Sequence, residues 1–238
     1  LMRDWSHGYI EYALDFVAGG LYEEAAGLLG LYLQDVEKVY PIIYYLLGYI
    51  CMKQSNPSLA QEYFVKAEKC DSAYCFPNRI EEVLILQEAV RQNPSDAKAF
   101  YYLGNFWYAS RRYENAVSCW EQSATIDPEF PTVWRNLSLA YYNKCNNREK
   151  AVAALEKAFA LDNTDARILM ELDQLYKKLG RSYAERLIFL EKHVALVESR
   201  DDLALERITL YNQLGRYSEA KALLAARKFH PWEGGEGK

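Results

Sequence analysis

The chain has 238 residues and a formal net charge of −5, and half of its residues are hydrophobic. This acidic balance argues against a nucleic-acid binder that depends on a basic surface, because phosphate contacts dominate such binding. No run approaches the ~18 consecutive apolar residues of a membrane-spanning helix, so no span is expected. The first residues carry no signal segment and the last ones stop abruptly, so we interpret the chain as a piece of a longer protein, truncated at both ends.

The five cysteines do not indicate a disulfide framework, because their number is odd and they are scattered along the chain. Cys70 and Cys75 have no further ligands nearby in the sequence, which argues against zinc. We interpret the cysteines as small apolar side chains in a reducing compartment. A cytoplasmic location is therefore favoured over a periplasmic one.

Apolar side chains recur at helical spacing in two pairs of segments near the N-terminus. The first pair has Tyr9, Tyr12, Ala13 and Phe16, then Gly19-Gly20, then Tyr22, Ala25 and Leu29. The second pair has Tyr44, Leu47, Gly48 and Cys51, then Ala60, Phe64 and Ala67. Each pair predicts a helical hairpin.

The next interval is irregular. Ala25 and Ala60 are 35 residues apart, but Ala60 and Ala116 are 56 apart. The extra residues, 72–94, contain an aromatic, proline-containing stretch and then an apolar helix expected from Ile80 to Asn93. We interpret this segment as a repeat whose first helix has become a loop. It either fills a gap between two stacks of hairpins or introduces a functional kink.

The pair within residues 97–130 is the clearest. Its first apolar face has Phe100, Leu103, Gly104 and Trp107, and its second has Tyr113, Ala116, Val117 and Trp120. Gly104 and Ala116 are informative because two helices approach closely only where side chains are short. Trp107 and Trp120 are expected to fill the space between layers, and Asp127-Pro128 ends the second helix.

Three more pairs follow, at residues 131–165, from residue 166 and from residue 201. Trp107, Tyr141, Tyr176 and Tyr211 are 34, 35 and 35 residues apart. This stride predicts stacked hairpins, each too small to bury its own apolar face and closed by its neighbours.

The residues Phe100, Leu103-Gly104, Trp107, Tyr113, Ala116, Trp120 and Pro128 resemble the tetratricopeptide repeat. Arg111 and Ser123 depart from it, since glycine and alanine are usual there. The resemblance implies an all-α fold: a right-handed superhelical solenoid of about six helix-turn-helix repeats over residues 1–228. Residues 229–238 would be an aromatic and glycine-rich tail that leads to a missing C-terminal segment.

A second resemblance concerns this tail together with residues 74–77 and 130–137. These are similar to the repeat region of bacterial multidomain proteins of the DUF5107 type, although Asn78 stands where phenylalanine is expected. In those proteins a β-sandwich of the kind associated with carbohydrate enzymes precedes the repeats. The resemblance implies a bacterial protein whose catalytic residues lie outside this chain.

No motif for catalysis is present. The three histidines, His7, His193 and His230, are not beside a serine or cysteine in a nucleophile motif, and there is no phosphate-binding loop. We therefore predict no catalytic residue, no metal site and no cofactor, and we expect a protein that is not an enzyme.

In the tetratricopeptide family the first helix of each pair lines a concave groove. Carried onto this sequence, the resemblance implies groove residues Tyr101, Tyr102, Asn105, Tyr108, Arg135, Asn136, Tyr142 and Arg167. Tyrosine offers a large contact area and a polar hydroxyl, which suits a peptide or a partner protein, including another domain of the same chain. The alternative is a carbohydrate-related accessory domain of a glycoside-active protein. No oligomeric state is predicted.

Some members of this family bind a C-terminal carboxylate through lysine, asparagine and arginine from three repeats. Asn105, Asn136 and Arg167 match three of those positions, but Tyr101 replaces the first lysine and Glu171 replaces the final arginine. Because a glutamate repels a carboxylate, the sequence argues against this kind of site.

Overall fold

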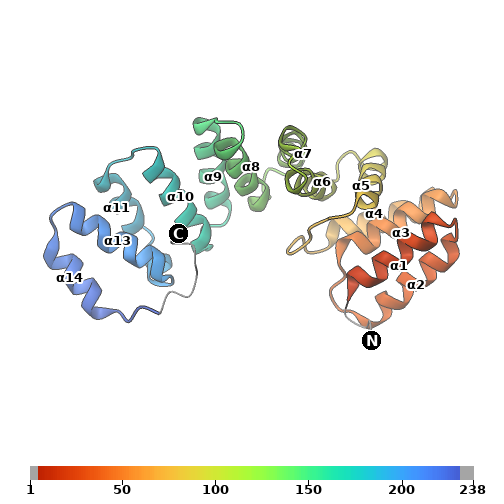
Figure 1. Ribbon diagram of the computed structural model, residues 1–238, viewed down its shortest axis with the longest axis horizontal. Coiled ribbons are helices and arrows are strands. Elements are labelled where there is room, and N and C mark those ends of the chain that lie inside the picture. Colours follow the sequence, from red (N-terminus) through yellow and green to blue (C-terminus); the bar gives the residue numbers. More distant parts are fainter. Residues whose placement is uncertain (1–4, 231–238) are drawn as a thin grey trace. The chain divides into compact units, whose positions relative to one another are not determined.

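The computed structural model describes residues 5–230, which form helices and connecting turns without any strand (Figure 1). The chain divides into two compact units, Leu1–Glu129 and Phe130–Lys238. Each unit consists of helical hairpins joined by short turns. The prediction of an all-α chain built from helix-turn-helix repeats is confirmed.

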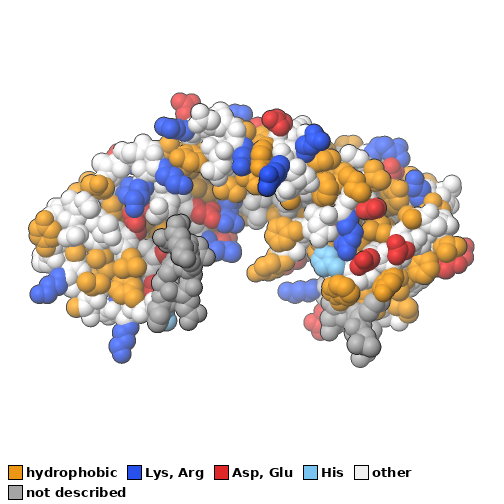
Figure 2. Space-filling model, in the orientation of Figure 1, with side chains coloured by type: hydrophobic (Ala, Val, Ile, Leu, Met, Phe, Trp, Pro, Cys, Tyr) orange, Lys and Arg blue, Asp and Glu red, His pale blue; other side chains and the backbone are white. Residues whose placement is uncertain are grey.

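The first unit contains three hairpins and one additional helix in its described part. Its helices are α1 (Ser6–Ala18), α2 (Tyr22–Asp35), α3 (Pro41–Lys53), α4 (Pro57–Lys69), α5 (Ile80–Gln92), α6 (Ala97–Ala109) and α7 (Tyr113–Ile126). Helix α5 corresponds to the predicted helix of the irregular segment and contacts α3 and α6. Residues 70–79 form a loop, as expected. Apolar side chains also make up a visible part of this unit's surface (orange in Figure 2).

The second unit also contains three hairpins over residues 130–230. Its helices are α8 (Pro131–Asn143), α9 (Arg148–Leu161), α10 (Ala166–Lys178), α11 (Tyr183–Glu191), α12 (Val194–Glu198), α13 (Asp201–Gln213) and α14 (Tyr217–Ala226). The segment after Gly180, the poorest match to the repeat pattern, is broken near His193 into α11 and the short α12. Residues 231–238, including Trp232, lie outside the described residues.

One turn residue in every hairpin of residues 5–230 has a left-handed backbone. These residues are Gly20, Ser55, Arg111, Asn146, Gly180 and Gly215. Their spacing follows the repeat predicted from the sequence, with one longer interval between Ser55 and Arg111. The following N–H reaches back across the turn, as in a Schellman motif; Arg112 N donates to Trp107 O at 2.8 Å. Arg111 therefore adopts the conformation that glycine usually supplies.

A short side chain occupies the crossing point of the helices in α3–α4 and α6–α7. A Cβ added to Gly104 would lie well inside van der Waals contact of the Trp120 ring, and one added to Gly48 would do the same to Phe64. Trp120 is 2% exposed and its Nε1 donates to Tyr101 O at 3.2 Å. Trp107, in contrast, is only partly buried. Trp120, rather than both tryptophans, therefore fills this interface.

The helix position equivalent to Gly104 is occupied by a polar residue in two hairpins of the second unit. Ser138 stands 34 residues after Gly104, and its hydroxyl donates to Ala151 O at 2.7 Å. Asp173 follows 35 residues later and is fully buried. It accepts two hydrogen bonds from Arg186, at 3.0 Å from Nε and 2.6 Å from Nη2.

Arg186 joins three helices. Besides Asp173 on α10, it donates to Glu206 Oε1 on α13 at 2.6 Å, and Lys177 reaches the same oxygen at 2.9 Å. Arg186 is 1% exposed, so its charge depends on these carboxylates for compensation. The buried ion pair replaces the close contact of short side chains and ties the α10–α11 hairpin to α13.

A buried acid links helices of the first unit. The Tyr45 hydroxyl donates to Asp96, with oxygen distances of 2.9 and 3.1 Å, and Asp96 caps α6 by accepting from Ala99 N at 2.9 Å. Asp96 and Tyr45 are both fully buried. Burial raises the pKa of Asp96 to about 6, because the neighbouring donors only partly offset the loss of water.

We expect Gly104→Ala to destabilise the protein by about 1–3 kcal/mol, because the new methyl group overpacks the contact with Trp120. Gly27 lies within α2 with no atom near its added Cβ. Gly27→Ala should therefore stabilise by about 0.5–1 kcal/mol through helix propensity. Urea unfolding of both variants measures the difference; equal effects would show that the Gly104 crossing is not tight.

Asp96→Asn should remove a pH dependence of stability. Because the folded state binds the Asp96 proton more tightly than the unfolded chain, this carboxyl stabilises fully below about pH 4, and the contribution is lost as the pH rises through about 6. The free energy of unfolding should therefore fall by an extra ~2–3 kcal/mol across this window in the wild type relative to Asp96→Asn. Urea unfolding at several pH values tests this, with the exposed Asp71→Asn as control. Parallel pH profiles for wild type and Asp96→Asn would contradict it.

Arg186→Met alone should destabilise by about 3–5 kcal/mol, because it leaves Asp173 charged and unpaired in the interior. The double variant Asp173→Leu with Arg186→Met should recover most of that loss, since apolar side chains of similar size can replace a buried ion pair. Thermal unfolding of the single and double variants measures the coupling. Additive losses would mean that the two side chains act independently.

Candidate interaction groove

Two of the predicted groove residues in the first unit are buried. Tyr101 is 4% exposed and Tyr102 is fully buried, so the expectation that they present their rings to a ligand is wrong. The Tyr102 ring packs edge-on against Tyr45 of α3 with a centroid distance of 6.1 Å, and its hydroxyl lies beside the Cys75 thiol. The loop of residues 70–79 thus covers a face of α6 that a regular repeat would leave open.

The other two predicted residues of this unit also take part in packing. Asn105 Oδ1 accepts from Trp120 Nε1 at 3.2 Å. The Tyr108 ring packs against Tyr113 and Trp120 with centroid distances of 5.2 and 5.3 Å. Both side chains are partly exposed. Their role in ligand binding stays a prediction.

The second unit has a groove of about 230 Å³ between α8 and α10. It is lined by Arg135, Ser138, Leu139, Tyr142, Asn143, Leu155, Met170, Glu171, Gln174, Leu175 and Lys178. Arg135 and Tyr142 are thus the two predicted groove residues that line it. The buried side chains of Ser138, Leu155 and Leu175 form its floor.

Two polar bridges cross this groove. The Arg135 guanidinium donates to both carboxylate oxygens of Glu171, with 2.7 Å between Nε and Oε2. The Lys178 ammonium lies over one face of the Tyr142 ring, 5.3 Å from the ring centroid, in a cation–π interaction. These bridges join α8 to α10 at positions two helical turns apart on each helix.

Apolar side chains of this groove remain accessible. Leu139 is 51% exposed, and Met170 is partly exposed. Gln174 adds an amide beside them. Because methionine is flexible and polarisable, it adapts to side chains of different shape. The groove can therefore take an apolar side chain in its centre and polar groups at both ends.

Asn136 and Arg167 do not line this groove. Arg167 pairs with Asp165, with 3.0 Å between Nη2 and Oδ2. Arg135 is already engaged by Glu171, so its charge is matched within the protein. Both observations agree with the sequence argument against a carboxylate-binding site.

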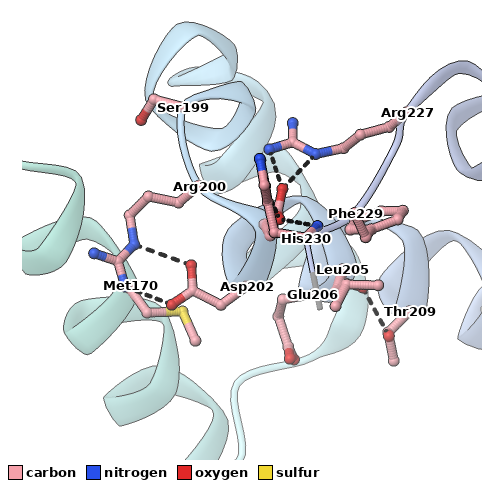
Figure 3. Close-up of a pocket in the computed structure, with 11 residues that line it drawn as sticks. Met170, Ser199, Arg200, Asp202, Leu205, Glu206, Thr209, Arg227, Phe229 and His230 are labelled. Carbon is pink, nitrogen blue, oxygen red and sulfur yellow. Dashed lines mark hydrogen bonds and ion pairs between the residues drawn. The ribbon is translucent and has the colours of Figure 1, made fainter. Parts of the chain in front are cut away.

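A second cavity of about 580 Å³ lies between α10, α13 and the segment Arg227–His230 (Figure 3). Met170 and Leu205 contribute apolar lining, and Arg200 pairs with Asp202 with 2.6 Å between Nη2 and Oδ2. The backbone N–H of His230, the Arg227 guanidinium and the His230 ring hold the pKa of Asp201 well below its ordinary value. The sequence analysis missed this cavity. The acidic start of α13 and the basic Arg227 were visible in the sequence, but their proximity was not.

No group of three or more His, Cys, Asp or Glu side chains within residues 5–230 is placed to hold a metal ion. Within the same range, no helix has both the length and the apolar character needed to cross a bilayer.

The fold and the groove define a helical-repeat protein, a class whose stacked hairpins create surfaces for contact with other molecules. The family model described as tetratricopeptide repeat matches residues 42–74 and 132–165. These matches correspond to the α3–α4 and α8–α9 hairpins with their following loops. The tetratricopeptide repeat model thus matches one hairpin in each unit, and the resemblance found in the sequence is supported over those residues.

Known proteins with the same type of repeat are similar over parts of the chain. Tetratricopeptide repeat protein 37 of Xenopus laevis is 26% identical over 134 residues, which is 54% of this chain and 8% of that protein. This chain therefore matches less than a tenth of that relative. The resemblance to bacterial DUF5107-type proteins receives no support from these matches.

Matches to solved structures cover most of this chain at low sequence identity. The match to the pilF protein of Pseudomonas aeruginosa covers 92% of this chain and 88% of the pilF chain, with a TM-score of 0.48 and 18% identity. The match to a thermophilic tetratricopeptide repeat protein of Thermus thermophilus covers 90% of this chain and 98% of that protein's chain, with a TM-score of 0.45 and 20% identity. Similarities at this level do not extend to function.

Proposed function

We propose that this chain is a non-catalytic interaction scaffold, and that the groove between α8 and α10 binds an extended peptide segment of a partner protein. The observation that carries the proposal is the half-exposed Leu139, which lies on α8 between Arg135 and Tyr142, the residues that form the two bridges, and lines the groove together with Met170. An accessible apolar centre with a polar rim is the arrangement found at protein–protein contacts.

The size of the groove favours a side chain of a peptide over a separate small molecule. At about 230 Å³ it is smaller than the ~300–1,000 Å³ of ordinary small-molecule pockets. A peptide can place one apolar side chain there while its backbone hydrogen-bonds to Gln174 or Asn143 at the rim. Another domain of the same protein could supply such a segment.

The first unit offers few of the predicted residues to a ligand. With Tyr101 and Tyr102 buried, its candidate ligand residues are reduced to the partly exposed Asn105 and Tyr108. The carbohydrate alternative is not proposed, since no match described above concerns carbohydrate and the tyrosines expected to contact a sugar are partly buried in the core.

A displayed library of random peptides, selected on the full chain, tests the proposal. Selected peptides should bind Leu139→Arg and Tyr142→Ala at least about tenfold more weakly, because a charge fills the apolar centre or the aromatic wall is removed. Titration followed by fluorescence polarisation measures the affinities.

Ile188→Arg is the matched control. Ile188 lies on α11, outside the groove, and is 56% exposed against 51% for Leu139. It should leave the affinities unchanged. If Ile188→Arg and Leu139→Arg weakened binding equally, the α8–α10 groove would not be the binding surface.

A further inference from the structure

The segment Arg227–His230 is bound to the second unit in the manner of an extended peptide. Helix α14 ends at Ala226, and Arg227 has extended backbone angles, with φ −119° and ψ 138°. The segment then lies against the end of α12 and the start of α13, with the Arg227 side chain directed toward α13 (Figure 3).

Asp201, the first residue of α13, is the principal acceptor for this segment. Its Oδ1 accepts from Arg227 Nε at 2.9 Å and from Nη2 at 2.6 Å. Its Oδ2 accepts from the His230 backbone N at 2.9 Å and lies 2.9 Å from His230 Nδ1. One carboxylate thus accepts hydrogen bonds from a guanidinium side chain and from the backbone N–H three residues later. This combination selects both the arginine of the bound segment and the direction of its backbone.

The third nitrogen of Arg227 contacts a different helix. Its Nη1 donates to Glu198 O at 2.9 Å and to Glu198 Oε2 at 3.0 Å, at the last residue of α12. All three guanidinium nitrogens are therefore engaged, and Arg227 is 19% exposed. Lysine has no such planar fork and could not satisfy Asp201 and Glu198 together.

The aromatic residue of the segment faces the second cavity. Phe229 lines this space of about 580 Å³ together with Met170, Leu205 and Thr209. Lys228 between the two is exposed, and the His230 ring is 90% exposed. Recognition therefore rests on residues 227 and 229 and on the backbone at 230.

We propose that this face of α10, α12 and α13 is a second peptide-binding site, whose resident occupant is Arg227–His230. Its ligand is an extended segment with an arginine followed two residues later by an aromatic residue. A partner protein that carries such a segment displaces the resident one. This site goes beyond the proposed function, since the residues that hold the segment, Asp201 and Glu198, lie on α13 and α12; Met170 of α10 lines both this cavity and the α8–α10 groove.

The chemistry of the contact makes exchange feasible. The segment is held mostly by partly exposed ion pairs and by one aromatic side chain. Exposed ion pairs contribute little net stability. A partner segment would make the same bonds to Asp201 and Glu198, so displacement leaves no buried charge unpaired.

A fluorescent peptide with the sequence of residues 224–230 serves as the probe. In the full chain, Arg227→Ala combined with Phe229→Ala should release the resident segment, and the probe should bind this variant at least about tenfold more tightly than it binds the wild type. A probe with alanine in place of its arginine should bind neither protein. Adding Asp201→Asn to the variant should return binding to the wild-type level.

Circular dichroism shows whether the variants keep their helices. The milder single change Arg227→Gln, which keeps Phe229, should give a smaller gain in the same direction. The proposal is overturned if the released variants bind the probe no better than the wild type, or if binding survives Asp201→Asn. Leu139→Arg should leave probe binding unchanged, so failure here is distinguishable from failure of the α8–α10 groove.

Discussion

The crossing of two helices inside each hairpin is the constraint on which the repeats depend. In the first unit the crossing is tight because Gly48 and Gly104 leave room for the rings of Phe64 and Trp120. A ring that occupies this space is buried without moving the helices apart. Where the short residue is lost, the second unit substitutes a hydrogen bond at Ser138 and an ion pair at Asp173. The two helices of a hairpin are thus held together at their crossing in three ways: by a glycine against a ring, by a serine hydrogen bond or by an ion pair.

The groove of the second unit follows from this arrangement. Once the inner faces of α8 and α10 are fixed against their partner helices, the opposite faces of both helices point away from the hairpin cores. Leu139, Tyr142 and Met170 lie there because the periodicity of an α-helix separates them from the core positions. The loop of residues 70–79 changes this in the first unit, where it covers Tyr102. One insertion thus decides which helices offer side chains to a ligand.

Much of the fold could be predicted from periodicity. The stride of Trp107, Tyr141, Tyr176 and Tyr211 placed the hairpins, and the long interval before Ala116 located α5. The turns at Arg111 and Asn146 were also recognisable from the repeat pattern, although Ser55, Arg111 and Asn146 adopt left-handed conformations without being glycine.

The site was less predictable, for physical reasons. The repeat resemblance assigned Arg135 and Tyr142 to a groove, and both line the space between α8 and α10. It did not show that Tyr101 and Tyr102 would be buried, since their burial depends on contacts from distant parts of the chain. Nor could it bring Arg227 back to Asp201, because the path of an extended segment after a helix is set by tertiary contacts. Sequence periodicity assigns faces of helices, and long-range contacts decide which faces are covered.

The buried pair of Asp173 and Arg186 also constrains how this sequence can change over evolutionary time. Loss of Arg186 alone leaves Asp173 without its partner in the interior, whereas loss of Asp173 alone leaves Arg186 with Glu206 as its remaining partner. The two positions should therefore vary together among descendants of this chain, with Glu206 as a third, weaker member of the group.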